Sequence, residues 1–404
     1  MYRHCNHNRV YLLGILLLIP GQLIAEDLTP EIRLERGEFK SRQQQGSNAL
    51  LKGRRWLEQQ QRYDGSWQSK TYASLESSIA ASALVMSTLV EITPPGVAQD
   101  DSIRRGLNHL TSKLNQGEIW KSVEAESNYP LYSISLMLTT LNQVKPDTTA
   151  NQRLRESLSQ VLLRRQQILE PSHRSGEDVA GGWKPGSELF QQGSAANPAN
   201  VSVTYFTLAA LSGAGKLPRQ NRIAALDYLQ HSQIPAGAWG AGGFMFTMMA
   251  DHPLNKAGWN RSQDGTLNGI SYLSATCDGI SALLACDITS DDQRIRSALT
   301  VLPQLSRSRL AEIRLKAEGS YQKLDALFFY EAAATARVWK QLRGEGVENQ
   351  FLNSRCNEIL QTLIVKQHAD GHWENPLPWM REDDPLIATA FALQAIHRRL
   401  ARAE

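Results

Sequence analysis

Two stretches of the chain follow the same pattern, and this pattern decides the fold. The first is Lys52-Gly53-Arg54-Arg55-Trp56-Leu57-Glu58-Gln59-Gln60-Gln61, continued by Asp64-Gly65-Ser66-Trp67. The second is Leu363-Ile364-Val365-Lys366-Gln367-His368-Ala369-Asp370-Gly371-His372-Trp373. In both, a Gln-rich helix end is followed by a Gly and then a Trp. Weaker copies end at Trp120, Trp183, Trp239 and Tyr321, and a spacing of roughly fifty to eighty residues indicates a tandem helical array.

Each repeat contains two expected helices. The first is charged and amphipathic and runs into the Gln/Gly/Trp element. The second is rich in Ala, Ser, Thr and Leu and carries few charges; these helices are expected at residues 77–90, 131–141, 201–211, 274–286, 326–339 and 387–400. A helix with few charges on any side is typical of a buried helix. The sequence therefore predicts an all-α fold, a closed alpha/alpha toroid of about six helix pairs with the uncharged helices inside.

The N-terminus has the composition of a secretory signal. Arg3, His4 and Arg9 precede an apolar run at residues 10–19 that is too short to span a bilayer, and small residues follow near Ala25. We therefore expect a signal peptide at 1–25, a mobile lead-in at 26–47 and a single toroid domain at 48–404. The mature protein would be periplasmic or extracellular, with no stable membrane span after cleavage.

The composition restricts the kinds of partner. Hydrophobic residues make up 42% of the chain, which is enough for a large core. Cleavage of the signal leaves 41 basic and 40 acidic residues with no basic stripe, so nucleic acid is not an expected partner. The three remaining cysteines are Cys277, Cys286 and Cys356, and the first two fall on opposite faces of one expected helix. Disulfides are therefore not expected to hold the fold.

The element at residues 52–67 resembles the repeat of squalene–hopene cyclases and other triterpene cyclases. The run Ala388-Thr389-Ala390-Phe391-Ala392-Leu393 is similar to the inner helices of the same superfamily. The superfamily also includes protein prenyltransferase beta subunits and complement-type thioester domains. The resemblance covers nearly the whole mature chain and implies an active cavity inside the inner ring, with chemistry in the loops that precede the inner helices. Such a scaffold motif indicates a fold more than an activity.

Class II terpene cyclases protonate an alkene with an Asp-x-Asp-Asp-Thr motif, and this chain has no copy. The nearest run is Glu382-Asp383-Asp384, in which adjacent carboxylates could raise one another's pKa. Alternatively, Asp384 caps the helix that begins at Pro385. The candidate proton donors or carbocation stabilisers are Asp383, Asp384, Asp278 and Glu76.

Other chemistries of the superfamily fit less well. Prenyltransferase beta subunits bind zinc through an Asp, a Cys two residues later and a distant His, whereas Cys277 and Asp278 are adjacent here and diverge on a helix. The possible third ligands are His252 and His372, and His372 lies in the Gln/Gly/Trp element at residues 363–373. The thioester run is absent. We expect no metal ion and no cofactor.

The candidate substrate-binding residues are aromatic. Those near the expected inner helices are Tyr132, Tyr205, Tyr272 and Phe329, and those in a Gly- and Met-rich insertion of the fourth repeat are Phe244 and Trp259. Aromatic faces stabilise carbocations, although aromatics at helical spacing also form ordinary cores.

Two functional hypotheses remain. In the first, the protein is an exported terpenoid-cyclase-like toroid that binds or acts on a hydrophobic isoprenoid-type ligand in its inner cavity. In the second, it is a non-catalytic scaffold that binds a protein or peptide partner at the toroid mouth. Absence of the protonation motif favours the second hypothesis, and the fold resemblance favours the first.

Overall fold

The computed structural model describes most of the chain after the N-terminal segment. The described residues are 30–72, 79–94, 101–118, 129–144, 148–166, 181–185, 198–249, 254–261, 265–306 and 322–401. The predicted signal peptide at 1–25 lies outside them. The chain divides into two compact units, Met1–Arg42 and Gln43–Glu404, and the first described helix is α1 (Pro30–Gln59). The segment expected as a lead-in is therefore helical from Pro30 onwards.

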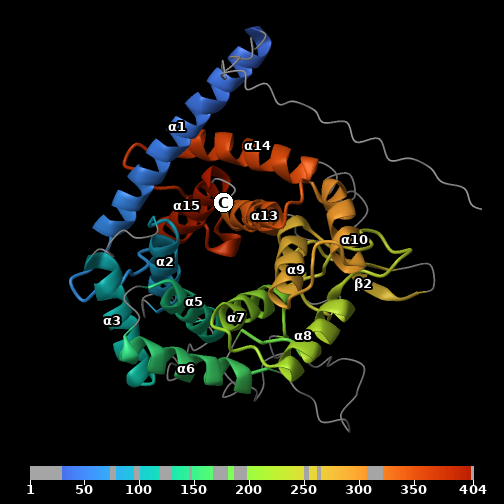
Figure 1. Cartoon of the computed structure of the whole chain (residues 1–404), viewed down its shortest axis with the longest axis horizontal. Helices are drawn as coiled ribbons and strands as arrows, with labels where there is room; N and C mark the ends of the chain where they lie inside the picture. Colours follow the sequence, from blue (N-terminus) through green and yellow to red (C-terminus); the bar gives the residue numbers. More distant parts are fainter. Residues whose placement is uncertain are drawn as a thin grey trace, which may run out of the picture. The chain divides into compact units, whose positions relative to one another are not determined.

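Six inner helices of the larger unit form a closed ring (Figure 1). They are α2 (Ile79–Glu91), α5 (Pro130–Gln143), α7 (Val201–Gly213), α9 (Leu273–Ala285), α13 (Phe328–Gly344) and α15 (Pro385–Leu400). Each packs against the next, and α15 packs against α2. These helices are almost entirely buried, which their low charge predicts.

The outer layer of the larger unit consists of charged helices. From Gln43 on, α1 belongs to it, followed by α3 (Asp101–Asn115), α6 (Thr149–Arg164), α8 (Arg219–Ser232), α10 (Gln293–Val301) and α14 (Gln350–Lys366). Short elements complete the described structure: the β1–β2 hairpin (Trp259–Arg261, Leu267–Gly269), α12 (Gln322–Asp325) and two 3₁₀ turns, η4 (Leu302–Leu305) and η5 (Pro378–Met380). The predicted alpha/alpha toroid of six helix pairs is confirmed in the described residues.

None of the helices in the described residues combines the length and the apolar character needed to cross a membrane.

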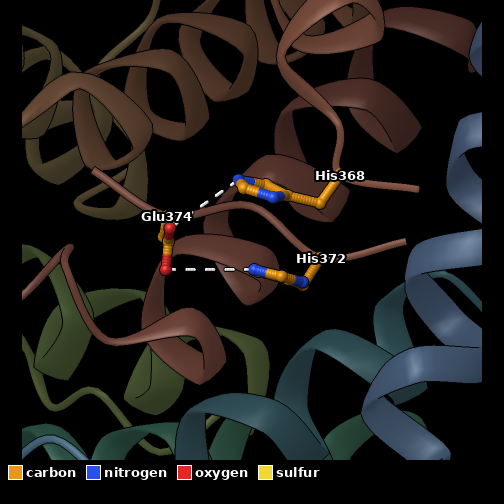
Figure 2. Close-up of side chains that lie close together, drawn as sticks. All are labelled: His368, His372 and Glu374. Atoms are coloured by element: carbon orange, nitrogen blue, oxygen red, sulfur yellow. Dashed lines mark ion pairs between the residues drawn. The ribbon is translucent and has the colours of Figure 1, made fainter. Parts of the chain in front are cut away.

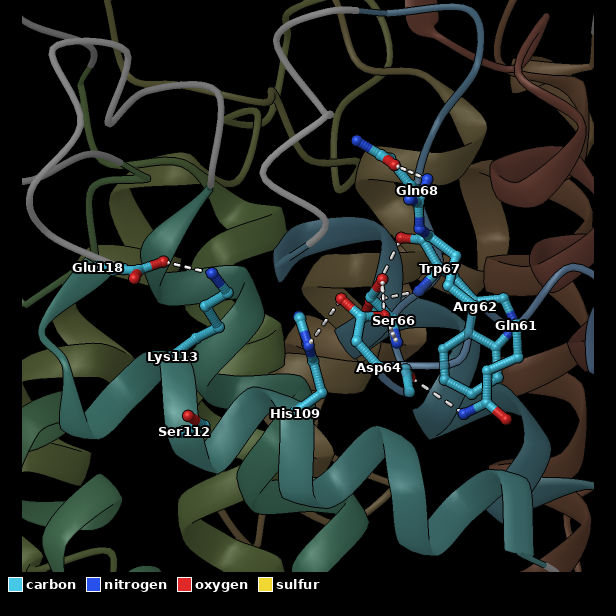
Figure 3. Close-up of polar contacts among 12 residues, drawn as sticks. Gln61, Arg62, Asp64, Ser66, Trp67, Gln68, His109, Ser112, Lys113 and Glu118 are labelled. Carbon is cyan, nitrogen blue, oxygen red and sulfur yellow. Dashed lines mark hydrogen bonds and ion pairs between the residues drawn. The ribbon is translucent and has the colours of Figure 1, made fainter.

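The Gln/Gly/Trp element ties three helices together in the first repeat; Figure 3 shows Gln61, Ser66 and Trp67 in its loop. The Gln61 side-chain amide, just after α1, donates to the carbonyl of Ser102 in α3, the next outer helix, at 2.7 Å. The Trp67 indole N–H donates to the carbonyl of Leu57 at 2.7 Å, and its backbone N–H donates to the Ser82 hydroxyl of α2 at 2.8 Å. One loop thus joins two successive outer helices to the inner helix between them.

The same bonds recur in the third and last repeats. Gln166 donates to the carbonyl of Asn221 in α8 at 2.8 Å, and Gln367 donates to the carbonyl of Ala49 in α1 at 2.9 Å. Because Ala49 belongs to the first outer helix, the last element closes the ring. The Trp side chains of these repeats are fully buried: Trp67, Trp183 and Trp373. The weaker copies at Trp120 and Tyr321 lie outside the described residues.

The fourth repeat places its aromatic residue differently from the sequence prediction. Gln233 donates to the carbonyl of Arg294 in α10 at 2.9 Å, which is the expected bridge. The buried aromatic position is filled by Phe244, whose backbone N–H donates to the Thr276 hydroxyl of α9 at 3.1 Å. The assignment of this position to Trp239, which is only half-buried, is therefore wrong. The Gly-rich turn lengthens the loop and moves the buried aromatic position by five residues, from Trp239 to Phe244.

Removal of the closing bridge should weaken the fold. Gln367→Ala leaves the carbonyls of Ala49 and Gly371 without this donor, so we expect the free energy of unfolding to fall by about 1–3 kcal/mol. Urea denaturation measures the change, and Lys366→Ala at the exposed preceding position is the matched control. Equal losses in the two variants would show that the bridge contributes nothing specific.

Candidate functional site

A buried ion pair lies within the inner ring, between α9 and α13. The Asp278 carboxyl is fully buried, and Arg337, 6% exposed, donates to its Oδ1 at 2.5 Å. The Tyr330 hydroxyl donates to Asp278 Oδ2 at 2.7 Å. Buried charges require a partner because their transfer from water costs several kcal/mol per ion. Asp278 and Arg337 satisfy each other, which explains why charged residues occur in these two helices.

The polar network extends from this pair toward α7. The Tyr330 hydroxyl lies 2.6 Å from the Ser202 hydroxyl, and the Arg337 guanidinium lies 3.8 Å from the centre of the Tyr205 ring. Arg337 also donates to Ser281 at 3.0 Å. Because α7 and α13 are separated in the ring by α9, these contacts reach across its interior. Ser202 and Tyr330 lie in the first turn of their helices, whereas Asp278 and Arg337 lie nearer the middle of α9 and α13.

The Asp278 carboxyl is a stronger base than an ordinary aspartate. Burial raises its pKa, because the low-dielectric interior disfavours the anion, while Arg337 and the hydrogen bond from Tyr330 act in the opposite direction. Burial also raises the pKa of Tyr330, and the charge of Asp278 adds to that rise. The two groups therefore hold a proton in a shared hydrogen bond well inside the protein.

Half-buried aromatic residues lie in the N-terminal halves of four inner helices. Tyr132 of α5 packs edge-on against Phe206 of α7, with ring centres 5.4 Å apart, and Tyr330 of α13 packs edge-on against Phe391 of α15 at 5.2 Å. All four rings keep part of their surface exposed. Since the outer helices cover the outside of the ring, we place these exposed faces toward its interior end.

The insertion of the fourth repeat brings a lysine to the network, and sequence reasoning missed it. The Asn255 side chain accepts hydrogen bonds from the backbone N–H groups of Phe246 and Thr247 and so folds the segment. Lys256 Nζ then lies 3.5 Å from the centre of the Phe246 ring. Burial lowers the pKa of Lys256 to about 7, and the negative charge of Asp278 acts against this shift.

The three adjacent carboxylates of the predicted acidic cluster serve different helices. Glu382 accepts hydrogen bonds from the backbone N–H groups of Phe329 and Tyr330 at the start of α13, at 2.8 and 2.7 Å. Asp384 caps α15 by accepting from Leu386 N–H at 2.8 Å, and it also accepts a hydrogen bond from Ser69. The capping alternative for Asp384 is thus confirmed.

Asp383, the third member, is half-buried, and its Oδ1 accepts a hydrogen bond from the Tyr72 hydroxyl at 2.5 Å. Burial and the neighbouring Asp383 raise the pKa of Tyr72. Glu76, the fourth candidate acid, lies outside the described residues. Of the candidate acids that the structure describes, Asp278 is the one joined to the inner polar network.

The aromatic candidates divide into two groups. Tyr132, Tyr205 and Tyr272 lie near Asp278: Tyr205 contacts Arg337, and the charge of Asp278 helps raise the pKa of the other two, for which burial is the main cause. The remaining candidates lie elsewhere. Phe244 occupies the buried aromatic position of the fourth Gln/Gly/Trp element, and Phe329 belongs to the hydrophobic core. Trp259, 44% exposed, lies on the β1–β2 hairpin.

Cys277 has the environment of a structural residue. Its thiol is fully buried, and burial raises its pKa. A zinc site of the prenyltransferase kind would need a histidine beside Cys277 and Asp278. Of the two candidates, His252 lies outside the described residues and His372 lies in the loop of the last Gln/Gly/Trp element. Cys277, Cys286 and Cys356 are all buried free thiols.

The fold matches that of solved terpene cyclases. The chain is similar to type II terpene cyclase MstE from Scytonema, with a TM-score of 0.54 and 15% identity to a variant in complex with geranylgeranyl dihydroxybenzoate, described as its substrate. A second variant, in complex with the product merosterolic acid A, gives a TM-score of 0.51 and 15% identity. Each match covers 89% of this chain and 99% of that chain. The predicted terpenoid-cyclase-like toroid fold is confirmed. No protein-family model and no curated protein matches the chain.

Removal of one partner of the Asp278–Arg337 ion pair should lower the free energy of unfolding strongly. Arg337→Met leaves the Asp278 carboxylate buried without its cation, and we expect about 3–5 kcal/mol less stability. The double variant with Asp278→Asn should recover part of this loss, because no buried charge remains. Chemical denaturation measures the cycle, and Arg294→Met, which breaks the more exposed pair with Asp292, should cost about 0–1 kcal/mol. Additive losses at Asp278 and Arg337 would contradict the coupling.

The lysine should make stability depend on pH. In the folded protein the pKa of Lys256 is about 7, against 10.5 for an ordinary lysine, so between these values the unfolded chain binds more protons. Stability should therefore rise with pH across this window and fall as the pH drops toward 7. Lys256→Met should flatten the dependence, whereas Lys216→Met, at a surface ion pair, should leave it unchanged. A dependence that survives Lys256→Met would assign it to other groups.

Proposed function

We propose that this protein is a terpenoid-cyclase-like enzyme that binds a hydrophobic isoprenoid-type molecule at the N-terminal ends of its inner helices and exchanges a proton with it through Asp278. The observation that carries the proposal is the placement of the Asp278–Tyr330 hydrogen bond beside the half-buried aromatic residues of the inner helices. The ligand class follows from those rings, because their faces suit an apolar chain with double bonds and stabilise positive charge. The isoprenoid complexes of the Scytonema cyclase support the same class.

The chemistry requires a protonated carboxylic acid, so the Asp278 carboxylate of the ion pair must first take up a proton. Burial favours the protonated form of Asp278, and the adjacent Arg337 favours loss of the proton. In the reaction, the acid gives its proton to an alkene carbon, whose π electrons form the new C–H bond and leave a carbocation. The aromatic faces and the new carboxylate stabilise that cation. Loss of a proton from a neighbouring carbon to the carboxylate restores the acid, so the net reaction is an isomerisation or cyclisation without an oxidant.

The predicted signal peptide at 1–25 leads us to propose export to the periplasm or the extracellular space. An exported enzyme would meet lipid-soluble isoprenoids at a membrane surface or in a carrier. N-terminal sequencing of the protein recovered outside the cytoplasm tests this part independently, since a mature end near residue 26 is expected.

The alternative, a non-catalytic binding scaffold for a protein or peptide, is favoured by a specific observation. The polar network from Ser202 through Tyr330 and Asp278 to Arg337 is internally satisfied and crosses part of the ring interior. Such a network could serve the fold alone. Exposed apolar side chains at Trp259 and Met249 of the insertion would then be candidates for contact with the partner.

Mass spectrometry distinguishes the two. The mature protein is incubated with squalene and with polyprenols, and both retained lipids and new isomers are measured. We expect a retained isoprenoid and a product of unchanged mass, with turnover reduced at least a hundredfold in Asp278→Asn and reduced less in Tyr330→Phe. Binding should persist in both variants.

The control is Asp383→Asn, which removes a carboxyl that bonds Tyr72 instead of the inner network. It should retain most activity. Turnover lost in Asp383→Asn but kept in Asp278→Asn would assign the acid to Asp383 and overturn our choice. No retained lipid and no product with any isoprenoid, in a folded protein, would favour the binding scaffold.

A further inference from the structure

Three potential metal ligands converge in the last scaffold loop, outside the inner ring (Figure 2). They are His368, His372 and Glu374, and one ligand atom from each lies within 4.8 Å of the others. His368 Nε2 lies 3.8 Å from Glu374 Oε1, and His372 Nε2 lies 3.9 Å from Glu374 Oε2. We propose that these residues bind a divalent zinc-class ion.

The scaffold fixes the backbone that carries them. Trp373 points into the core, and successive residues of an extended segment point to opposite sides, so His372 and Glu374 share the outer side. His368 N–H donates to the carbonyl of His372 at 2.9 Å, which closes a tight turn and brings the two imidazoles together. Their rings stack with centres 4.2 Å apart and planes 14° apart. The turn needs Gly371, whose φ is +108° and whose added Cβ would lie 2.7 Å from a backbone oxygen of α1.

A carboxylate orients one of the two imidazoles. His372 Nδ1 lies 2.6 Å from Asp370 Oδ1, which places the proton on Nδ1 and leaves the lone pair of Nε2 directed away from the turn. Metal-ligating histidines characteristically donate their other ring N–H to such a partner. The ring of Trp56 in α1, 5.2 Å from that of His372, supports the imidazole from the other side. The imidazole of His372 is therefore already oriented before a metal ion binds.

The donor set indicates the kind of ion. Two imidazoles and one carboxylate suit Zn²⁺ and its borderline neighbours, whereas Ca²⁺ and Mg²⁺ prefer oxygen ligands. Bonds of about 2.0–2.2 Å in a tetrahedron put ligand atoms roughly 3.3–3.6 Å apart. The side chains of His368 and Glu374 are 45% and 46% exposed, so they can move the short remaining distance inward. A water molecule would take the fourth position.

The first repeat provides an internal control, because the same turn exists there with other side chains. Arg62, Ser66 and Gln68 stand where the last repeat has His368, His372 and Glu374. Arg62 N–H donates to the carbonyl of Ser66 at 2.9 Å, as in the last repeat, and the Ser66 hydroxyl donates to Asp64 at 2.7 Å (Figure 3). Arg62 and Gln68 form a direct hydrogen bond. The fold therefore accepts either set of residues, and the ligand set is not a requirement of the scaffold.

The site lies where the ring closes. Gln367, next to His368, bridges to the carbonyl of Ala49, and Gly371 packs against Lys52. An ion bound by this loop would hold the closing segment in its turn and should resist its detachment from α1. The expected consequence is a zinc-dependent increase in thermal stability, because the ion binds the folded loop and not the unfolded chain.

The test uses the mature protein stripped of metal and titrated with ZnCl₂ in competition with a chromophoric chelator. We expect one tight site per chain and a higher melting temperature with zinc. The triple variant His368→Arg, His372→Ser, Glu374→Gln copies the first repeat, so it should fold with its melting temperature unchanged without zinc, and should bind zinc at least a hundredfold more weakly. Asp370→Asn should weaken binding about 10–100-fold.

Two further variants keep the proposal falsifiable. The exposed Glu374→Gln alone should weaken zinc binding even if the triple variant fails to fold. The reciprocal graft, Arg62→His, Ser66→His and Gln68→Glu, should add a second site. Zinc affinity that is the same in wild type, Glu374→Gln and the triple variant would overturn the proposal, as would an absence of any tight site in the wild type.

Discussion

Side-chain amides at the ends of four outer helices hold the described part of this toroid together. The described bridges, from Gln61, Gln166, Gln233 and Gln367, each donate to a backbone carbonyl of the following outer helix. The accepting carbonyls lie in the first turn of α3, α8 and α10 and within α1. A carbonyl oxygen has two lone pairs, so it can accept the glutamine amide in addition to its helical hydrogen bond, and the bridge joins the two helices. Because the last bridge returns to the first helix, the ring has no terminal repeat. Closure of this kind removes the need for the polar caps that open helical arrays require.

The closed ring also determines where chemistry can occur. The inner helices are surrounded by the outer layer, so a charge within them has no access to bulk water from the side and must be paired. Asp278 and Arg337 meet that requirement, and Arg398 and Glu91 do so at the α15–α2 contact through two bonds of 2.7 and 2.8 Å. Of these two pairs, the first also bonds a tyrosine that packs against a half-buried aromatic neighbour, Phe391. That difference separates a candidate reactive pair from one that joins two helices.

The sequence predicted the architecture because the architecture depends on local, repeated signals. Low charge identified the inner helices, and the Gln/Gly/Trp element located the turns. The site depends on pairs distant in sequence, such as Asp278 with Arg337, and periodicity carries no information on which helices meet. One signal was available: Arg337 interrupts the apolar run at 332–339, and a buried guanidinium must find an anion. Lys256 gave no such signal, because its position depends on how Asn255 folds the insertion.

The repeated turn separates what the fold requires from what it permits. Gly65 and Gly371 have φ of +87° and +108° with a backbone oxygen or carbon beside them, and Trp67 and Trp373 are fully buried, so these positions are fixed by sterics. The outward positions between them are not, since Arg62 and His368 occupy the same place in the same turn. The same turn therefore forms with either set of side chains, so the scaffold alone does not require two histidines and a glutamate there. The sequence pattern alone did not reveal this freedom, because His372 lies within the repeated Gln/Gly/Trp element. The comparison of its backbone with that of Ser66 shows that the element does not require a histidine there.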